Sequence, residues 1–155
     1  MLTAAVACLW MTFSAQNATV SIPLTAPEAP QSSTDVLLRT VLTNLLQKGY
    51  RELDPRNGAV IIEKGAANIS PRILPPEWKT GFALLPRDEI EALKQPNRYY
   101  LSLRVTSPVT ATADVTISAT PVGGGIALCC WTRVERYERI EDGWRFVRLI
   151  GATIH

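Results

Sequence analysis

The chain has 155 residues, the length of one domain, and 46% of them are apolar, which supplies a core and excludes wholesale disorder. Charged residues make up 19%, and the net charge is only +2. This small charge gives no case for nucleic-acid binding, which requires a concentrated basic stripe.

The N-terminal segment, residues 1–18, has the pattern of a secretory signal. Residues 2–13 are almost wholly apolar and are followed by small residues, although no Lys or Arg precedes them. The run is too short for a membrane span. We expect a cleaved signal and a secreted or periplasmic protein, with membrane contact only through this segment. A lipid anchor at Cys8 and a buried or partner-binding segment are the alternatives.

Residues 19–33 predict an extended tether, because Pro23, Pro27 and Pro30 stand among small polar residues that cannot build a core. The remaining residues, 34–155, are expected to form a single α+β domain.

A helix is predicted over residues 35–50, capped by Ser33 or Thr34. Asp35 lies in its first turn, where the helix dipole favours an anion. Its apolar residues recur at spacings of three and four and draw one broad stripe, wide enough to lie across a sheet.

The middle of the chain predicts short elements and one irregular crossing. Residues 53–58 form a turn, and the β-branched run 59–62 favours a strand, with a helical turn as the alternative. Three prolines make residues 66–79 irregular, and Trp78 and Phe82 are expected to pin this segment to the core. Residues 85–93 predict a short helix with Pro86 in its first turn.

The last third of the chain predicts a four-stranded antiparallel meander. Residues 121–125 contain three glycines but no Lys-Ser/Thr pair, so they predict a hairpin turn and not a phosphate-binding loop. Asp142-Gly143 is a stronger hairpin signal. The four expected strands are residues 99–105, 113–119, 126–139 and 144–150.

The candidate site residues are aromatic side chains and arginines between residues 78 and 145. The arginines and glutamates of the last two strands are expected to form cross-strand ion pairs on a solvated face. An anion-binding cluster is the alternative. The candidates are Trp78, Phe82, Tyr99, Trp131 and Trp144 for lining a pocket, and Arg133, Arg136 and Arg145 for binding an anion.

Metal and cofactor sites are not expected. The single histidine, His155, is the last residue, which leaves neither a multi-histidine site nor an internal histidine base. Cys129 and Cys130 are neighbours, and adjacent strand residues point to opposite faces, so they are interpreted as small apolar strand residues. A reactive thiol is the minority alternative.

Three stretches resemble the NTF2-like (cystatin-like α+β cone) superfamily. They are Ala-Asp-Val-Thr-Ile at 113–117, Arg-Tyr-Glu-Arg-Ile at 136–140 and Glu-Asp-Gly-Trp-Arg-Phe at 141–146. The resemblance spans about 40 residues and implies a long N-terminal helix packed on a curved antiparallel sheet. Family enzymes often use an Asp/His or Tyr/Asp set, and the Asp/His set has no internal histidine here.

Two functions from different classes follow. The resemblance favours a noncatalytic secreted or envelope-associated domain that binds a small ligand or a protein partner. The alternative is a small carboxylate-dependent lyase, isomerase or hydrolase, for which Asp114 and Glu63 are the acids next to strongly apolar runs. A homodimer formed through the sheet is a further possibility, which an apolar, uncharged outer face would support.

Overall fold

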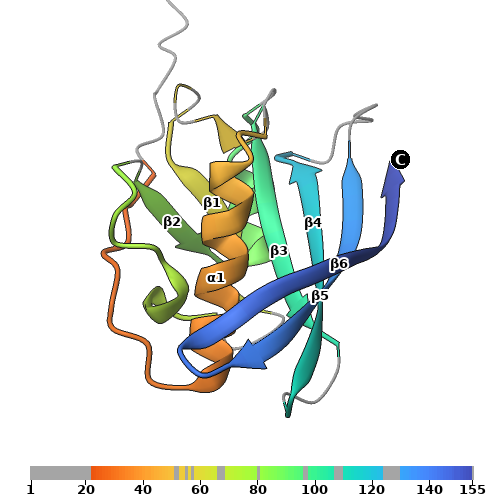
Figure 1. Cartoon of the computed structure of the whole chain (residues 1–155). Helices are drawn as coiled ribbons and strands as arrows, with labels where there is room; N and C mark the ends of the chain where they lie inside the picture. The colour runs from red at the N-terminus through yellow and green to blue at the C-terminus, as the bar shows by residue number, and fades with distance from the viewer. Residues whose placement is uncertain are drawn as a thin grey trace, which may run out of the picture.

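The computed structural model describes residues 22–50, 53–54, 56, 58–65, 69–79, 81–95, 98–106, 110–123 and 130–154. Its fold is α+β, with helix α1 (Ser33–Gln47) lying across one face of a curved six-stranded sheet whose two edges stay apart (Figure 1). The other elements are β1 (Val60–Glu63), the 3-10 turn η3 (Pro71–Ile73), β2 (Phe82–Leu85), α2 (Arg87–Ala92), β3 (Tyr99–Val105), β4 (Thr112–Pro121), β5 (Trp131–Ile140) and β6 (Gly143–Ile154).

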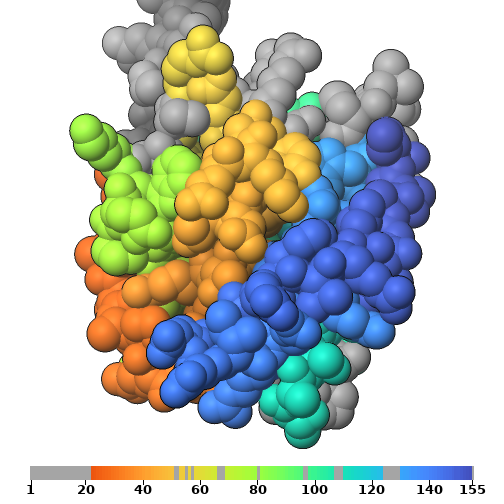
Figure 2. All heavy atoms as spheres, viewed as in Figure 1, coloured from red at the N-terminus to blue at the C-terminus, as the bar shows by residue number. Residues whose placement is uncertain are grey.

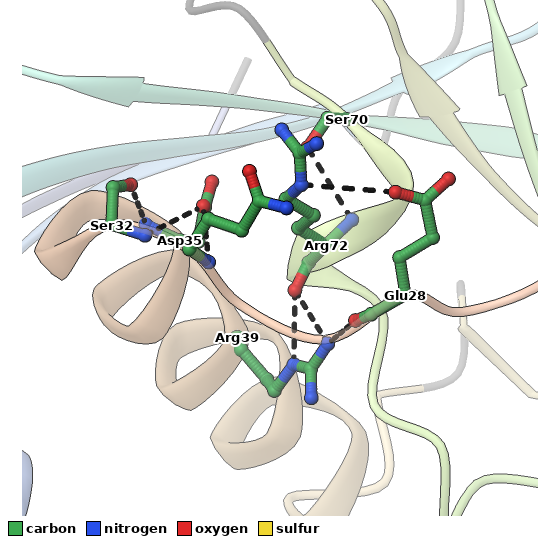
Figure 3. Close-up of polar contacts among 7 residues, drawn as sticks. Glu28, Ser32, Asp35, Arg39, Ser70 and Arg72 are labelled. Atoms are coloured by element: carbon green, nitrogen blue, oxygen red, sulfur yellow. Dashed lines mark hydrogen bonds and ion pairs between the residues drawn. The ribbon is translucent and has the colours of Figure 1, made fainter.

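Helix α1 begins with a reciprocal cap. Ser32 is the N-cap, one residue before the earlier of the two predicted caps. The Ser32 hydroxyl accepts a hydrogen bond from the Asp35 amide at 3.0 Å, and the Asp35 carboxylate accepts one from the Ser32 amide at 3.0 Å (Figure 3). Both bonds satisfy amide groups that the first turn of a helix leaves without partners.

Replacing Ser32 with alanine should lower the free energy of unfolding by about 1 kcal/mol, because the Asp35 amide loses its acceptor. Urea unfolding of S32A beside Gln31→Ala, a neighbouring exposed position, measures this effect. Equal stability of the two variants would contradict the role of the cap.

Helix α1 ends three residues before the predicted end at Tyr50. Gly49 adopts φ +66°, a left-handed conformation that terminates helices and that glycine tolerates best. The predicted stripe is confirmed, because its members are buried against the sheet: Leu37, Leu38, Val41, Leu42, Leu45 and Leu46.

Arg39 of α1 ties three distant segments together (Figure 3). Its guanidinium donates to the carbonyl of Arg72 in η3 through Nε at 3.1 Å and Nη2 at 2.6 Å, and also to the carbonyl of Glu28. The Arg72 Nε and Glu28 Oε2 atoms are 3.7 Å apart. Residues of the predicted tether are therefore held against the folded domain.

The predicted meander is confirmed as β3 to β6, four consecutive antiparallel strands. The Asp142-Gly143 hairpin is also confirmed, with Gly143 at φ +146°. The predicted start of the third strand, residues 126–129, lies outside the described residues, as do Cys8, Cys129 and His155.

The sheet contains two more strands than the meander. β1 confirms the predicted strand and pairs in parallel with both β3 and β2. Phe82 is buried in the core, as predicted, and Trp78 packs against that core, but Phe82 is also the first residue of strand β2, which was not predicted. Residues 82–85 form a run of only four apolar residues, too short to show a strand period.

Two cores lie on the two faces of the sheet. The larger one lies between α1 and the inner face, and includes buried residues of β1, β3, β4 and β5. The smaller one lies on the opposite face under α2, around Ile61, Ile90 and Tyr100. Helix α2 covers the β1–β2–β3 part of the sheet, and no helix of the described residues lies over the outer face of β4, β5 and β6 (Figure 1).

Candidate functional site

A charged cluster lies on the inner face of β5, beside the C-terminal end of α1. Its centre is Glu135, which is 0% exposed. The Tyr137 hydroxyl donates to Glu135 Oε2 at 2.6 Å, and Lys48 Nζ lies 3.3 Å from Glu135 Oε1. Arg133, whose side chain is 14% exposed, forms an ion pair with the same Oε1 atom. One buried carboxylate is thus held by two cations and one hydroxyl.

Aromatic rings enclose this charged cluster. The Tyr50 and Trp131 rings lie 5.2 Å apart, and Arg133 donates to the Tyr50 hydroxyl. On the other side, Phe146 meets Tyr137 edge-on at 5.8 Å, with Lys48 Nζ 4.9 Å from the Phe146 ring centre. Glu135 is thus fully buried beneath these rings, whereas Lys48, whose side chain is 40% exposed, reaches it from the surface.

The Tyr137 hydroxyl stays protonated in this setting. Burial raises the pKa of Tyr137 well above its ordinary value, and the hydrogen bond to Glu135 raises it further, while a hydrogen bond from Asn44 opposes the shift. A neutral tyrosine donates to the carboxylate, and the carboxylate already has Lys48 and Arg133. These contacts join β5 to the residue that follows α1, so the cluster fixes the two elements to each other.

The expectation of a solvated charged face is wrong for Arg133 and Glu135. Alternation along β5 puts them on the face that Trp131 and Tyr137 share, and that face packs toward α1. The alternation can be read from the sequence. However, Glu135 stands between Arg133 and Arg136, and such a mixture of charges is typical of ion pairs on an exposed face.

The expectation of cross-strand ion pairs is confirmed for the other face. Arg136 forms two hydrogen bonds to Asp114 on β4, at 2.7 and 2.8 Å. Arg145 on β6 pairs with Glu138 on β5. The structure does not bring the three predicted anion-binding arginines together, because Arg133 lies on the opposite face of β5 and each has its own carboxylate.

The Asp114–Arg136 pair predicts a pH effect. Hydrogen bonding to Arg136 lowers the pKa of Asp114 below its ordinary value, and burial opposes this weakly. The pKa of Asp114 is lower in the folded state than in the unfolded state, where it is about 3.9. The ion pair therefore stabilises the fold above about pH 3.9, and this stabilisation is lost as the pH falls through the folded-state pKa. Urea unfolding should show D114N less stable than the wild type at neutral pH, with the difference closing in acid. A difference that persists in acid would contradict the ion pair.

The predicted pocket-lining aromatics are spread through the core. Phe82 and Trp144 are buried, Trp78 and Trp131 are partly buried against the same core, and Tyr99 is half-buried at the start of β3. Trp144 also lines an open depression of about 290 Å³ between the start of α1 and the β5–β6 hairpin. Of the five, Trp144 is the residue that borders this depression.

The two candidate acids lie on different strands, β1 and β4, with β3 between them. Glu63 is half-buried at the end of β1, and Asp114 is held by Arg136. Cys130 is half-buried. Within the described residues, no group of three or more His, Cys, Asp or Glu side chains is placed to hold a metal ion.

Strand β6 carries a surface that sequence reasoning missed. It is the last strand of the sheet, and almost all of its residues are exposed. Figure 2 shows β6 on the molecular surface, with none of the described residues over it in this view. Its exposed apolar side chains, here called the β6 apolar set, are Phe146, Val147, Leu149, Ile150 and Ile154.

The described part of the chain contains no helix long and apolar enough to span a membrane. Comparison of the whole chain with protein-family models, with curated proteins and with solved structures finds no match.

Proposed function

We propose that this chain is a noncatalytic binding domain that holds a protein partner on β6, and that its fold is an NTF2-like cone. The element order supports the fold proposal, since a helix, an irregular middle and a long curved sheet follow one another (Figure 1). The apolar N-terminal segment supports the second part of the proposal, that the domain acts outside the cytoplasm, secreted or periplasmic.

The exposure of the β6 apolar set carries the proposal of partner binding. Leu149 and Ile150 are each 46% exposed and Ile154 is 81% exposed. Single exposed apolar residues are ordinary on protein surfaces, whereas a contiguous apolar patch marks an interaction site. Five such residues lie within nine positions of this one edge strand, and Phe146, Leu149 and Ile154 share its inner face.

The buried polar groups support a noncatalytic role. Glu135 is the buried carboxylate of the inner face, and it is bonded to Tyr137, Lys48 and Arg133. A general base needs a free lone pair directed at a substrate. The enzyme alternative would instead need these contacts to open when substrate binds.

The outer face of the sheet gives less support to the predicted homodimer. Its central row consists of hydroxyl side chains, and the next rows carry the Asp114–Arg136 pair and Arg104. This face is neither apolar nor uncharged. The hydroxyl row runs across four strands through Ser102, Ser118, Thr132 and Thr153.

Site-specific photocrosslinking in the cells that produce the protein tests the proposal. A benzophenone amino acid replaces Ile150 on β6 in one variant and Thr116 on the outer face in a matched control. We expect a discrete light-dependent adduct from position 150 only, and its loss when Leu149→Ser is added. No adduct, or equal adducts from both positions, would overturn the proposal.

N-terminal sequencing of the protein recovered from the same cells tests the compartment. A mature chain that begins near residue 19 would support export. An intact Met1 on protein in the cytoplasmic fraction would overturn it.

A further inference from the structure

The two edges of the sheet are treated differently. At the β2 edge, the Thr25 amide donates to the carbonyl of Phe82 at 2.6 Å, and the Leu84 amide donates to the Thr25 hydroxyl at 3.2 Å. This edge is thus partly capped by the chain itself. At the other edge, β6 pairs only with β5 within the described residues. Natural proteins cover or shorten such edges, because unpaired amide and carbonyl groups invite another strand.

Strand β6 is long for an edge strand. It has 12 residues, whereas typical strands have about 5–6. Its first half carries Arg145 and Arg148, and its second half, residues 149–154, carries no charge. Arginines on an edge can block unwanted pairing, which accounts for the first half. Two bulges, at Val147 and Ile150, also disturb this edge, whereas the uncharged residues 151–154 pair regularly with β5 and have neither device.

The charge of strand β6 itself is one-sided. β6 carries Arg145 and Arg148 and no acidic residue, whereas β5 carries three arginines and two glutamates and the β5–β6 turn adds Glu141 and Asp142. Arg148 lies opposite Arg136 in the register, and Asp114 on β4 is the carboxylate next to both. One acid therefore faces two arginines, which leaves a positive charge beside the open edge.

We propose that β6 accepts an extended acidic segment of a partner protein as a seventh strand of the sheet. This inference rests on the proposed function and deepens it. Backbone hydrogen bonds to the free edge would supply affinity. Apolar side chains of the segment would pack with Leu149 and Ile154, which share the inner face with their β5 partners Glu135 and Trp131. Acidic side chains on the other face would meet Arg148.

Charge argues against a second copy of this chain as the occupant. β6 contains no acidic residue, and Arg148 lies at its middle. Two β6 strands paired about a two-fold axis through their middles would place the two Arg148 side chains close together. Like charges placed opposite each other destabilise strand pairs. An acidic strand removes this repulsion and balances the excess charge.

Binding of defined peptides to the full chain tests the inference. A fluorescent peptide of about eight residues alternates Glu with Val, and a matched peptide carries Lys in place of Glu. Fluorescence anisotropy should show binding of the acidic peptide at about tenfold or greater preference over the Lys peptide, weakening from about 0.05 M to about 0.5 M NaCl. The R148E variant should lower affinity for the acidic peptide by about tenfold or more. Its unfolding midpoint is measured in parallel.

Backbone methylation of the peptide distinguishes binding through backbone hydrogen bonds at the sheet edge from binding through side chains alone. Methylating the amides of the Val residues blocks one edge of the peptide, and methylating those of the Glu residues blocks the other. Strand addition predicts that one of the two methylated peptides loses binding while the other keeps it. Equal effects of the two, or no charge preference, would overturn the inference.

Two further outcomes have fixed meanings. If a partner crosslinks at position 150 but neither peptide binds, the inference of a seventh strand is wrong. The proposed function, partner binding on β6, would still stand. A chain that sediments as a dimer, with an adduct at position 150 to a second copy, would overturn the acidic segment as the occupant.

Discussion

Replacing Glu135 with alanine is expected to lower the free energy of unfolding by about 3–5 kcal/mol, one of the two largest effects of a single substitution that we predict for this chain. Glu135 is fully buried, and its carboxylate neutralises Arg133 and accepts from Tyr137. Without it, the largely buried Arg133 would lose the carboxylate with which it pairs, and the Tyr137 hydroxyl would lose its acceptor. Urea unfolding of E135A at neutral pH measures the loss.

A second variant tests how much of the stability loss comes from the unpaired buried charge and how much from the cavity that alanine leaves. The double variant E135L/R133M fills the site with apolar side chains and leaves no buried charge, since the Lys48 side chain is 40% exposed, so it should recover part of the stability that E135A loses. The Tyr137 hydroxyl still lacks its acceptor in this variant. Glu138→Ala is the matched control, because Glu138 pairs with Arg145 on the exposed face and such pairs contribute about 0–1 kcal/mol. A loss from E135A no larger than that from E138A would show that the cluster is not held as described.

Tyr137 gives the cluster an independent readout. Y137F removes only the hydroxyl that donates to Glu135, and hydrogen bonds to charged groups contribute about 1.5–3 kcal/mol. Because the folded-state pKa of Tyr137 is raised, its contribution is present below the unfolded-state pKa of about 10 and is lost as pH rises above it. The stability difference between Y137F and the wild type should therefore narrow in strong alkali.

The parts of the fold that the sequence predicted are those set by local chemistry. Asp35 in the first turn of α1, the leucine stripe behind it and the Asp142-Gly143 turn each depend on neighbours along the chain. Each carries its own signal, either a cap, a period or a positive φ. The α+β class and the order of the meander follow from these signals.

The parts that were missed depend on partners distant in sequence. Strand β2 becomes a strand because β1 pairs with it in parallel, and residues 82–85 alone do not reveal that pairing. Glu135 is buried because Lys48 and Tyr50 cover it from the end of α1. The exposure of β6 is likewise a consequence of where α1 ends and of its place as the last strand. From the sequence alone, the apolar residues of β6 are as consistent with a buried strand as with an exposed one.

Replacing Trp144 with alanine is expected to cost about 3–5 kcal/mol, the usual loss for a large buried aromatic side chain. Trp144 is 6% exposed, and its indole Nε1 donates to the carbonyl of Ser33 at 3.1 Å. It therefore packs the β5–β6 hairpin onto the first turn of α1. The carbonyl of Ser33 would lose this partner, and a cavity would open beside the hairpin.

Phe146→Ala is the matched control for W144A, because Phe146 is the next inward-facing residue of the same strand and is 37% exposed. Urea unfolding should show a clearly smaller loss for F146A, since part of its ring already contacts water. Trp144→Phe keeps most of the apolar area but removes the donor to Ser33, and should fall between the two. If W144A and F146A lose equal stability, the hairpin is not fixed to α1 through Trp144. The path of β6 past the end of the helix would then depend on its pairing with β5 alone.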